Sequence, residues 1–126
     1  WDYTKYTVED YAAGFVRFTN GSSLVIESSF AANIGEEKFT SSLLGTQGGA
    51  ESHPLRIFSE VNDTLVDITP AYMPKASSYE LEVRGFYDAI QNDTEPPVTG
   101  EQALNVMKIL DGIYKSSEDG REVVVE

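Results

Sequence analysis

The chain has 126 residues and a mass of 13.9 kDa, which is the size of one ordinary domain. Its 21 acidic and nine basic residues give a net charge of −12, and such a field repels phosphate backbones and anionic lipid. The absence of cysteine excludes disulfides, thiolate metal sites and cysteine nucleophiles. We therefore expect no nucleic-acid partner, and because the apolar runs are short we expect no membrane partner.

The first half of the chain is predicted to form β-strands. An apolar stretch from Tyr11 to Thr19 precedes Asn20-Gly21, which is the strongest short signal for a β-hairpin. Ser23 to Ala32 then runs back, with apolar residues favoured at alternate positions. Further strands are expected at Lys38–Gly45, at Ala50–His53, and at Leu55–Val61 and Thr64–Thr69, the last two joined across Asn62-Asp63.

The first predicted strand carries apolar side chains on both of its faces. Tyr11, Ala13 and Phe15 lie on one side, and Ala12, Val16 and Phe18 lie on the other. A sheet exposed to solvent on one side alternates apolar with polar residues instead. We expect one face to pack on helices and the opposite face to pack on another domain or another copy of the chain.

The second half is predicted to form two helices. The first follows a capping box at Ser77-Ser78-Tyr79-Glu80, and the segment from Asn92 to Pro97 ends it because prolines cannot continue a helix. Its apolar stripe is Tyr79, Val83, Phe86, Tyr87 and Ile90, and Glu80 is expected to pair with Arg84. The second helix begins with a capping box at Thr99-Gly100-Glu101-Gln102, has the stripe Ala103, Val106, Met107, Leu110, Ile113 and Tyr114, and ends at a left-handed Gly120. A short last strand is expected at Val123–Val125. The fold class is therefore α+β, with a mostly antiparallel open sheet and helices on one face.

No motif in the sequence defines an active site. His53 is the only histidine, and we interpret it as a surface or hydrogen-bonding residue because a metal site usually needs more than one imidazole. Gly45-Thr46-Gln47-Gly48-Gly49 fits neither the dinucleotide fingerprint nor a P-loop, and we interpret it as a turn between strands that needs positive φ. A Ser-His-Asp triad stays open, although no Gly-x-Ser-x-Gly turn is present.

Three further groups of residues have a simple structural interpretation. The acidic groups Glu36-Glu37, Glu80/Glu82 and Glu118-Asp119 resemble solvated surfaces. Asn20, Asn62 and Asn92 match the glycosylation pattern but also suit turns. Tyr6, Tyr11, Tyr72 and Tyr79 are candidates for a sugar site, and core or interface positions explain most of them better.

The order of several short segments nevertheless resembles a known family. In the first half these are Val8-Glu9-Asp10-Tyr11-Ala12-Ala13, Phe18-Thr19-Asn20-Gly21-Ser22 and Gly45-Thr46-Gln47-Gly48-Gly49-Ala50. In the second half they are Phe86-Tyr87-Asp88-Ala89-Ile90, Pro97, Gly100-Glu101-Gln102-Ala103 and Ile113-Tyr114-Lys115-Ser116-Ser117 before Gly120. From Val8 to Val125 the chain resembles the carboxyl-terminal domain of the glucose-fructose oxidoreductase/inositol dehydrogenase (Gfo/Idh/MocA) family.

The resemblance implies a two-domain, cytoplasmic oxidoreductase. Its amino-terminal Rossmann domain would bind NAD or NADP, and its second domain would be a large, mostly antiparallel sheet with helices on one face and a dimer interface on the open face. Such enzymes oxidise or reduce hydroxyl and carbonyl groups of sugars, inositols and related compounds, and a minority carry out other chemistry such as glycoside cleavage.

Residues 1–126 would then be a single carboxyl-terminal domain, with the cofactor bound by the absent Rossmann domain. The family's Gly-rich cofactor turn, its Glu-Lys-Pro segment and its Asp and His pair do not occur in the chain. We therefore assign no catalytic, cofactor-binding or metal residue, and we expect the isolated fragment to be an inactive scaffold that forms part of the substrate pocket and the dimer interface. Two alternatives stay open: a free-standing, non-catalytic binding or assembly module of the same fold, and an acid/base hydrolase that uses two converging carboxylates.

Overall fold

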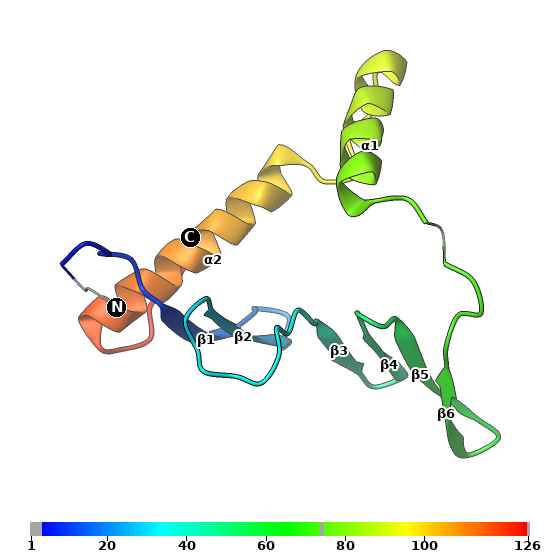
Figure 1. Ribbon diagram of the computed structural model, residues 1–126, viewed down its shortest axis with the longest axis horizontal. Helices are drawn as coiled ribbons and strands as arrows, with labels where there is room; N and C mark the ends of the chain where they lie inside the picture. Colours follow the sequence, from blue (N-terminus) through cyan, green and yellow to red (C-terminus); the bar gives the residue numbers. More distant parts are fainter. Residues whose placement is uncertain (1–3, 74, 126) are drawn as a thin grey trace. The chain divides into compact units, whose positions relative to one another are not determined.

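The computed structural model describes residues 4–73 and 75–125 of the protein (Figure 1). In chain order the elements are β1 (Tyr11–Arg17), β2 (Ser23–Ser29), β3 (Ser42–Gly45), β4 (Gly48–Glu51), β5 (Arg56–Val61), β6 (Thr64–Ile68), α1 (Ser78–Asn92) and α2 (Gly100–Asp119). All strand pairs are antiparallel, within one sheet of order β1-β2 and one of order β3-β4-β5-β6. The predicted α+β class is confirmed. The chain divides into two units, residues 1–33 with 78–126 and residues 34–77.

Strands β1 and β2 form the predicted hairpin around Asn20-Gly21. Its register sets Phe15 opposite Val25 and Gly14 opposite Ile26. Gly21 has a φ of 89°, a conformation that a residue without Cβ adopts at low cost. Its N–H donates to the carbonyl of Phe18 at 3.0 Å, which closes the turn. The strands are shorter than predicted because pairing stops at Arg17 and Ser29.

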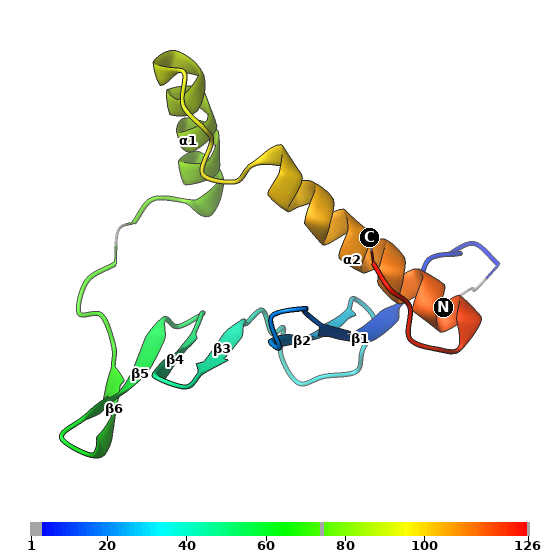
Figure 2. The same cartoon turned by 180° about the vertical axis from the view of Figure 1, so that it is seen from behind.

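The carboxyl-terminal half of α2 lies along one face of this hairpin (Figures 1 and 2). At Gly14 a Cβ would stand 2.8 Å from Cδ1 of Ile113 and 3.1 Å from Cγ2 of Ile26. A glycine is therefore what lets helix and strand approach this closely. The contact places Ala12, Gly14 and Val16 on the helix side of β1, where these residues are half-buried.

Both ends of α2 form as predicted. The hydroxyl of Thr99 accepts from the N–H of Gln102 at 3.2 Å, and the side chain of Gln102 accepts from the N–H of Thr99 at 2.9 Å. This is a complete capping box, which satisfies two of the free donors at a helix start. At the other end Gly120 is left-handed, with a φ of 62°.

The capping box predicted for α1 is wrong. The carboxylate of Glu80 does not reach back to Ser77 but accepts from the guanidinium of Arg84 at 2.8 Å, because the two side chains lie one helical turn apart. After α1 the chain turns back on itself, and Pro97 lies so close to the helix that a Cβ at Gly85 would stand 2.8 Å from its Cγ. Ala89 in α1 is 6% exposed and is the one buried apolar residue among those described.

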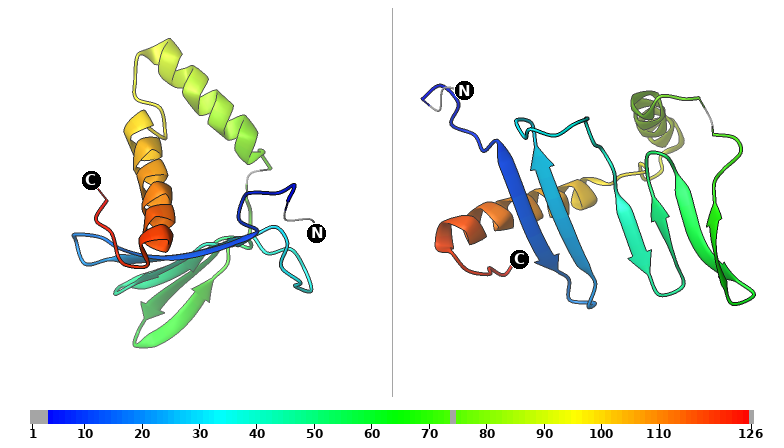
Figure 3. Two further views of the ribbon diagram at one scale, coloured as in Figure 1. Left: turned by 90° about the vertical axis from the view of Figure 1, so that its left-hand side faces the viewer. Right: turned by 60° about the horizontal axis from the view of Figure 1, so that its bottom comes forward.

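The four-stranded sheet is a meander of three hairpins, drawn in teal to green in Figure 3. Asn62 and Asp63 join β5 to β6, with φ values of 52° and 58°. Two successive positive φ angles match the right-handed twist of the flanking strands, so this predicted hairpin is confirmed. The predicted strand Lys38–Gly45 is reduced to β3, and the strand predicted at Ala50–His53 is β4.

The prediction for Gly45–Gly49 is half wrong. The segment does connect two strands, but no glycine in it has a positive φ. Gly48 and Gly49 belong to β4, where a Cβ would stand 2.7 Å from the carbonyl oxygen of Phe58 and 2.9 Å from that of Leu43, respectively. These glycines are therefore required by close approach of neighbouring strands.

The strand predicted at Val123–Val125 does not form. These residues are an irregular tail, and Val125 instead packs on α2, where a Cβ at Gly112 would stand 2.6 Å from its Cγ2. An apolar contact with a helix takes the place of a strand partner. Within residues 4–73 and 75–125, neither helix is long and apolar enough to cross a membrane.

Candidate functional site

The face of the β1–β2 hairpin that points away from α2 is the first candidate. We call it the outer face, and it consists of Tyr11, Ala13, Phe15 and Arg17 of β1 with Ser23, Val25, Glu27 and Ser29 of β2. The cross-strand pair Phe15 and Val25 is 65% and 75% exposed. An aromatic and a branched side chain side by side in solvent are typical of a surface that a partner covers.

Polar contacts fix the edges of the outer face. The hydroxyl of Tyr11 donates to Glu27 at 2.9 Å, on the neighbouring strand. The guanidinium of Arg17 makes a two-pronged ion pair with Glu122, with Nη2 2.6 Å from Oε1 and 2.7 Å from Oε2. Arg17 and Glu122 are far apart in the sequence, so this pair fastens the carboxyl-terminal tail to β1. Pairing through more than one hydrogen bond fixes the geometry, and because the two side chains are 66% and 69% exposed, water screens much of the attraction.

A third contact joins the segment before β1 to α2. The hydroxyl of Tyr114 donates to the carboxylate of Glu9. This hydrogen bond lowers the pKa of Glu9 and raises the pKa of Tyr114, because it favours the charged carboxylate and the neutral phenol. Together with the pair of Arg17 and Glu122 it brackets the contact between α2 and β1.

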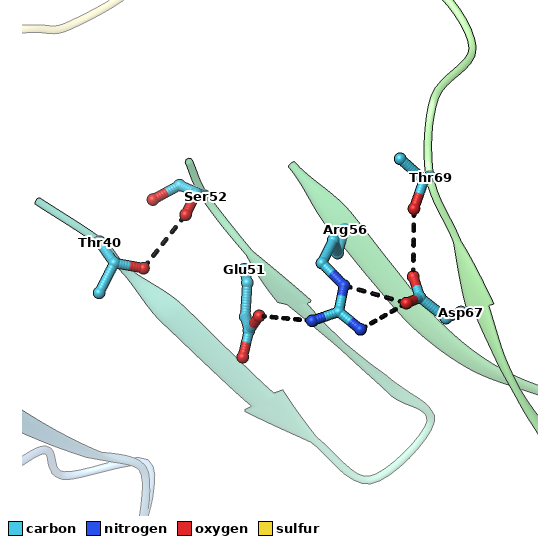
Figure 4. Close-up of polar contacts among 6 residues, drawn as sticks. All are labelled: Thr40, Glu51, Ser52, Arg56, Asp67 and Thr69. Carbon is cyan, nitrogen blue, oxygen red and sulfur yellow. Dashed lines mark hydrogen bonds and ion pairs between the residues drawn. The ribbon is translucent and has the colours of Figure 1, made fainter. Parts of the chain in front are cut away.

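The second candidate lies on the four-stranded sheet. We call Glu51, Arg56, Phe58 and Asp67 the Arg56 cluster, and Figure 4 shows its three charged members, Glu51, Arg56 and Asp67. The guanidinium of Arg56 donates from Nε and Nη2 to Oδ2 of Asp67, at 3.0 and 2.5 Å, and its Nη1 lies 3.5 Å from Oε2 of Glu51. Its central carbon stands 4.9 Å from the centre of the Phe58 ring. The cation is therefore held on three sides.

The strand register explains why these four residues meet. Glu51 is opposite Arg56, and Phe58 is opposite Asp67. Arg56 and Phe58 are two residues apart on β5, so all four side chains share one face. The β5–β6 hairpin across Asn62-Asp63 was predicted from the sequence, but its register sets Asp67 opposite Phe58, and the diagonal pairing of Asp67 with Arg56 was missed.

The Arg56 cluster gives the protein a pH-dependent contact. The hydrogen bonds from Arg56 lower the pKa of the Asp67 carboxyl. A carboxylate whose pKa is lowered by folding stabilises the folded state above its unfolded pKa, and this contribution is lost as the pH falls through the folded value. Asp67→Asn is therefore expected to lower the urea midpoint of unfolding at neutral pH and to have a progressively smaller effect in acid.

The matched control for Asp67→Asn is Asp63→Asn, in the turn of the same hairpin. Asparagine tolerates the left-handed backbone of Asp63, whose φ is 58°. We expect little difference between this variant and the wild type at any pH. If the effect of Asp67→Asn were unchanged in acid, the pairing with Arg56 would not be its cause.

The residues singled out in the sequence do not gather into a catalytic centre. His53 is exposed between β4 and β5, and its ring meets that of Phe39 edge-on at 5.4 Å. The hydrolase alternative needs a buried carboxylate, yet none of the described acidic residues is buried. Within the part of the chain that the structure describes, no three His, Asp or Glu side chains are grouped to hold a metal ion.

The asparagines and tyrosines behave differently from each other. Asn20 and Asn62 lie in turns, as predicted, whereas the turn predicted for Asn92 is wrong because Asn92 is the last residue of α1. The four tyrosines, Tyr6, Tyr11, Tyr72 and Tyr79, are all more than half exposed, so none is a core residue in this chain. Tyr11 belongs to the outer face.

The described residues do not fit a nicotinamide dinucleotide. Its phosphates are held by a glycine-rich turn between a strand and a helix, whereas Gly45–Gly49 joins two antiparallel strands. A hollow of about 530 Å³ beside the β1–β2 turn is lined by Phe15, Phe18 and the pair of Arg17 and Glu122. It is open and has no helix amino terminus in its lining to receive a phosphate.

Comparison with known proteins identifies the domain. A family model described as "Oxidoreductase family, C-terminal alpha/beta domain" matches residues 2–125. The chain is 28% identical over 124 residues to a D-glucoside 3-dehydrogenase of Escherichia coli (strain K12), which covers 98% of the chain and 35% of that protein. It is 27% identical over 127 residues to D-xylose 1-dehydrogenase (NADP(+)) 2 of Haloferax volcanii, which covers 94% of the chain and 38% of that protein.

The chain thus spans little more than a third of the length of these curated relatives. The resemblance noted in the sequence is confirmed by the family match over nearly all of its residues. Antiparallel strands with two helices, and a first strand held against α2 through Gly14, are consistent with the alpha/beta domain that the family model describes. The chain belongs to the Gfo/Idh/MocA oxidoreductase family and represents its carboxyl-terminal α/β domain.

Proposed function

We propose that the chain is the substrate-side and oligomerisation domain of a cytoplasmic, NAD(P)-dependent dehydrogenase that acts on a sugar, an inositol or a related hydroxyl or carbonyl compound. The observation that carries this proposal is the family match over residues 2–125. The printed names of both relatives, a D-glucoside 3-dehydrogenase and a D-xylose 1-dehydrogenase, support a sugar as the substrate class. The cofactor would be bound by an amino-terminal Rossmann domain.

The role in assembly rests on the outer face. Phe15 and Val25 form an exposed apolar pair on the side of the sheet opposite α2. A second copy of the chain is the partner we propose for this surface, because a symmetric dimer lets one surface cover itself. At its edge Arg17 is paired with Glu122, and on the face itself the carboxylate of Glu27 accepts a hydrogen bond from the hydroxyl of Tyr11, so the charged groups of the face already have polar partners.

The proposed activity is tested with the full-length protein. Reduction of NAD⁺ and NADP⁺ is followed by absorbance with a panel of D-glucosides, free aldoses including D-xylose, and inositols. We expect turnover with at least one of these classes and a clear preference for one cofactor. Failure with every class, in a protein that binds the cofactor, would remove sugars and inositols from the proposal.

The isolated chain is expected to bind neither NADH nor NADPH. Hydride transfer needs a positioned nicotinamide, and the described residues offer no phosphate-binding turn for one. Calorimetric titration of residues 1–126 with NADH and with NADPH checks this prediction. Stoichiometric binding would contradict the proposal that a separate amino-terminal domain binds the cofactor.

The alternative of a free-standing binding or assembly module makes a different prediction. In that case the full-length protein itself would bind no nicotinamide cofactor, and the coding sequence upstream of Trp1 would contain no strand, Gly-x-Gly-x-x-Gly turn and helix. Reading that sequence distinguishes the two functions directly.

A further inference from the structure

The turn between β1 and β2 holds the side chain of Asn20 in a defined position. Its Oδ1 accepts two hydrogen bonds from a single residue, from the N–H of Ser22 at 3.0 Å and from the hydroxyl of Ser22 at 2.7 Å. The residues of this turn are exposed, and a Cβ built at Gly21 would meet no atom within 4 Å. From this geometry we propose that Asn20 is a site of spontaneous deamidation and that Ser22 assists the reaction.

The reaction needs only water. The backbone nitrogen of Gly21 attacks Cγ of Asn20, loses its proton to solvent, and displaces the side-chain nitrogen, which leaves as ammonia. The resulting five-membered imide is then hydrolysed at either carbonyl, which gives aspartate or isoaspartate at position 20. Glycine at position 21 favours the attack because no Cβ obstructs the approach of its nitrogen.

The two bonds from Ser22 act on the atom that changes charge. When the nitrogen attacks Cγ, negative charge develops on Oδ1, and donors already directed at that oxygen stabilise the transition state. Because Asn20 and Ser22 are exposed, the hydroxyl of Ser22 is expected to stabilise the transition state by the net free energy of one ordinary hydrogen bond. Its removal should therefore slow the reaction roughly two- to tenfold.

One contact opposes the reaction. The N–H of Gly21 donates to the carbonyl of Phe18 at 3.0 Å, and this bond must open before the nitrogen can attack. The turn is exposed and closed by this bond and one other, from the N–H of Phe18 to the carbonyl of Ser22 at 2.9 Å. Local opening of such a turn costs far less than unfolding of the domain.

The chain contains its own comparison sites. Asn62 lies in a turn and Asn92 ends a helix, and both are exposed like Asn20. Each of them is followed by aspartate, at positions 63 and 93, whose Cβ and negative charge hinder attack by the backbone nitrogen. Deamidation is therefore expected at Asn20 well before it is detected at Asn62 or Asn92.

The test is incubation of the full-length protein at mildly alkaline pH, followed by digestion and peptide mass spectrometry. Chromatography separates the aspartate and isoaspartate products. We expect the Asn20 peptide to convert first and Ser22→Ala to slow its conversion roughly two- to tenfold. Equal or slower conversion at Asn20 than at Asn62 and Asn92 would overturn the proposed site.

A second measurement isolates the role of the folded turn. In concentrated urea the hydrogen bonds from Ser22 are absent, so wild type and Ser22→Ala should convert at the same rate. A slower variant in the native protein together with equal rates in urea supports assistance by Ser22. The same ratio of rates in both conditions, or no effect of Ser22→Ala on the native protein, would overturn that assistance.

Discussion

Phe15→Asp is expected to dissociate the oligomer of the full-length protein into monomers. In the proposed symmetric contact each copy buries one Phe15 against its partner, and full burial of such a side chain is worth about 1.5 to 3 kcal/mol. The substitution acts twice in a dimer, so the dissociation constant should rise roughly 10²- to 10⁴-fold. The introduced carboxylate adds a charge to a protein that is already strongly acidic.

Light scattering and sedimentation at several concentrations measure this change. The matched control is Val124→Asp in the carboxyl-terminal tail, where the side chain is 89% exposed and does not belong to the outer face. We expect that variant to keep the oligomeric state of the wild type. A Phe15→Asp protein that remains fully associated would show that another surface joins the copies.

The second large effect is expected at the contact between β1 and α2. Gly14→Val should destabilise the protein by about 1 to 3 kcal/mol, because a Cβ at this position stands 2.8 Å from Ile113 and 3.1 Å from Ile26. A branched side chain has two further methyl groups to place in the same gap. The free energy of unfolding of the full-length protein, measured in urea, reports the effect.

Gly112→Ala is the matched control. Its Cβ would stand even closer to a neighbour, 2.6 Å from Val125. Val125 lies three residues beyond the Arg17–Glu122 pair in an irregular segment, so it can shift without breaking that pair, and alanine also favours a helix interior by about 1 kcal/mol over glycine. We expect little loss of stability here. An unchanged midpoint for Gly14→Val would mean that α2 does not rest on β1 at this point.

A double variant separates crowding from other causes. If Gly14→Val acts by pushing on Ile113, then combining it with Ile113→Ala should cost less than the sum of the two single changes. Strictly additive losses would indicate that the two side chains do not compete for the same space.

The elements set by local chemistry were predictable from the sequence. Asn20-Gly21 and Asn62-Asp63 specify hairpins because Gly21, Asn62 and Asp63 adopt positive φ at low cost. Thr99 and Gln102 specify a helix start because their side chains satisfy free backbone donors three residues apart. Each of these signals lies within a few residues, so no knowledge of the fold was needed.

The errors arose where a distant partner decides the outcome. Positions 48 and 49 need glycine because carbonyl oxygens of neighbouring strands lie too close for a Cβ. A turn interpretation considers only residues that are adjacent in the sequence, so it misses those strands. Val123–Val125 has no neighbouring strand with which to pair, and Val125 packs on α2 instead. The cap predicted at Ser77 is a local error, since Glu80 pairs with Arg84 four residues along the same helix.

The candidate surfaces were predictable only in part. The two-sided apolar pattern of Tyr11 to Phe18 correctly placed one face of β1 against a helix, since Gly14 meets Ile113. The pairs of Arg17 with Glu122 and Glu9 with Tyr114 join residues 105 positions apart, and nothing local in either sequence segment indicates its partner.

The ion pair between Arg17 and Glu122 has a practical consequence for protein engineering. Removal of the tail beyond Gly120 would delete the carboxylate and leave an unneutralised guanidinium at the rim of the outer face. In the proposed contact between copies that cation would be covered without a carboxylate partner, which costs free energy. We therefore expect a shortened protein to associate more weakly through the outer face than the protein that keeps Glu122.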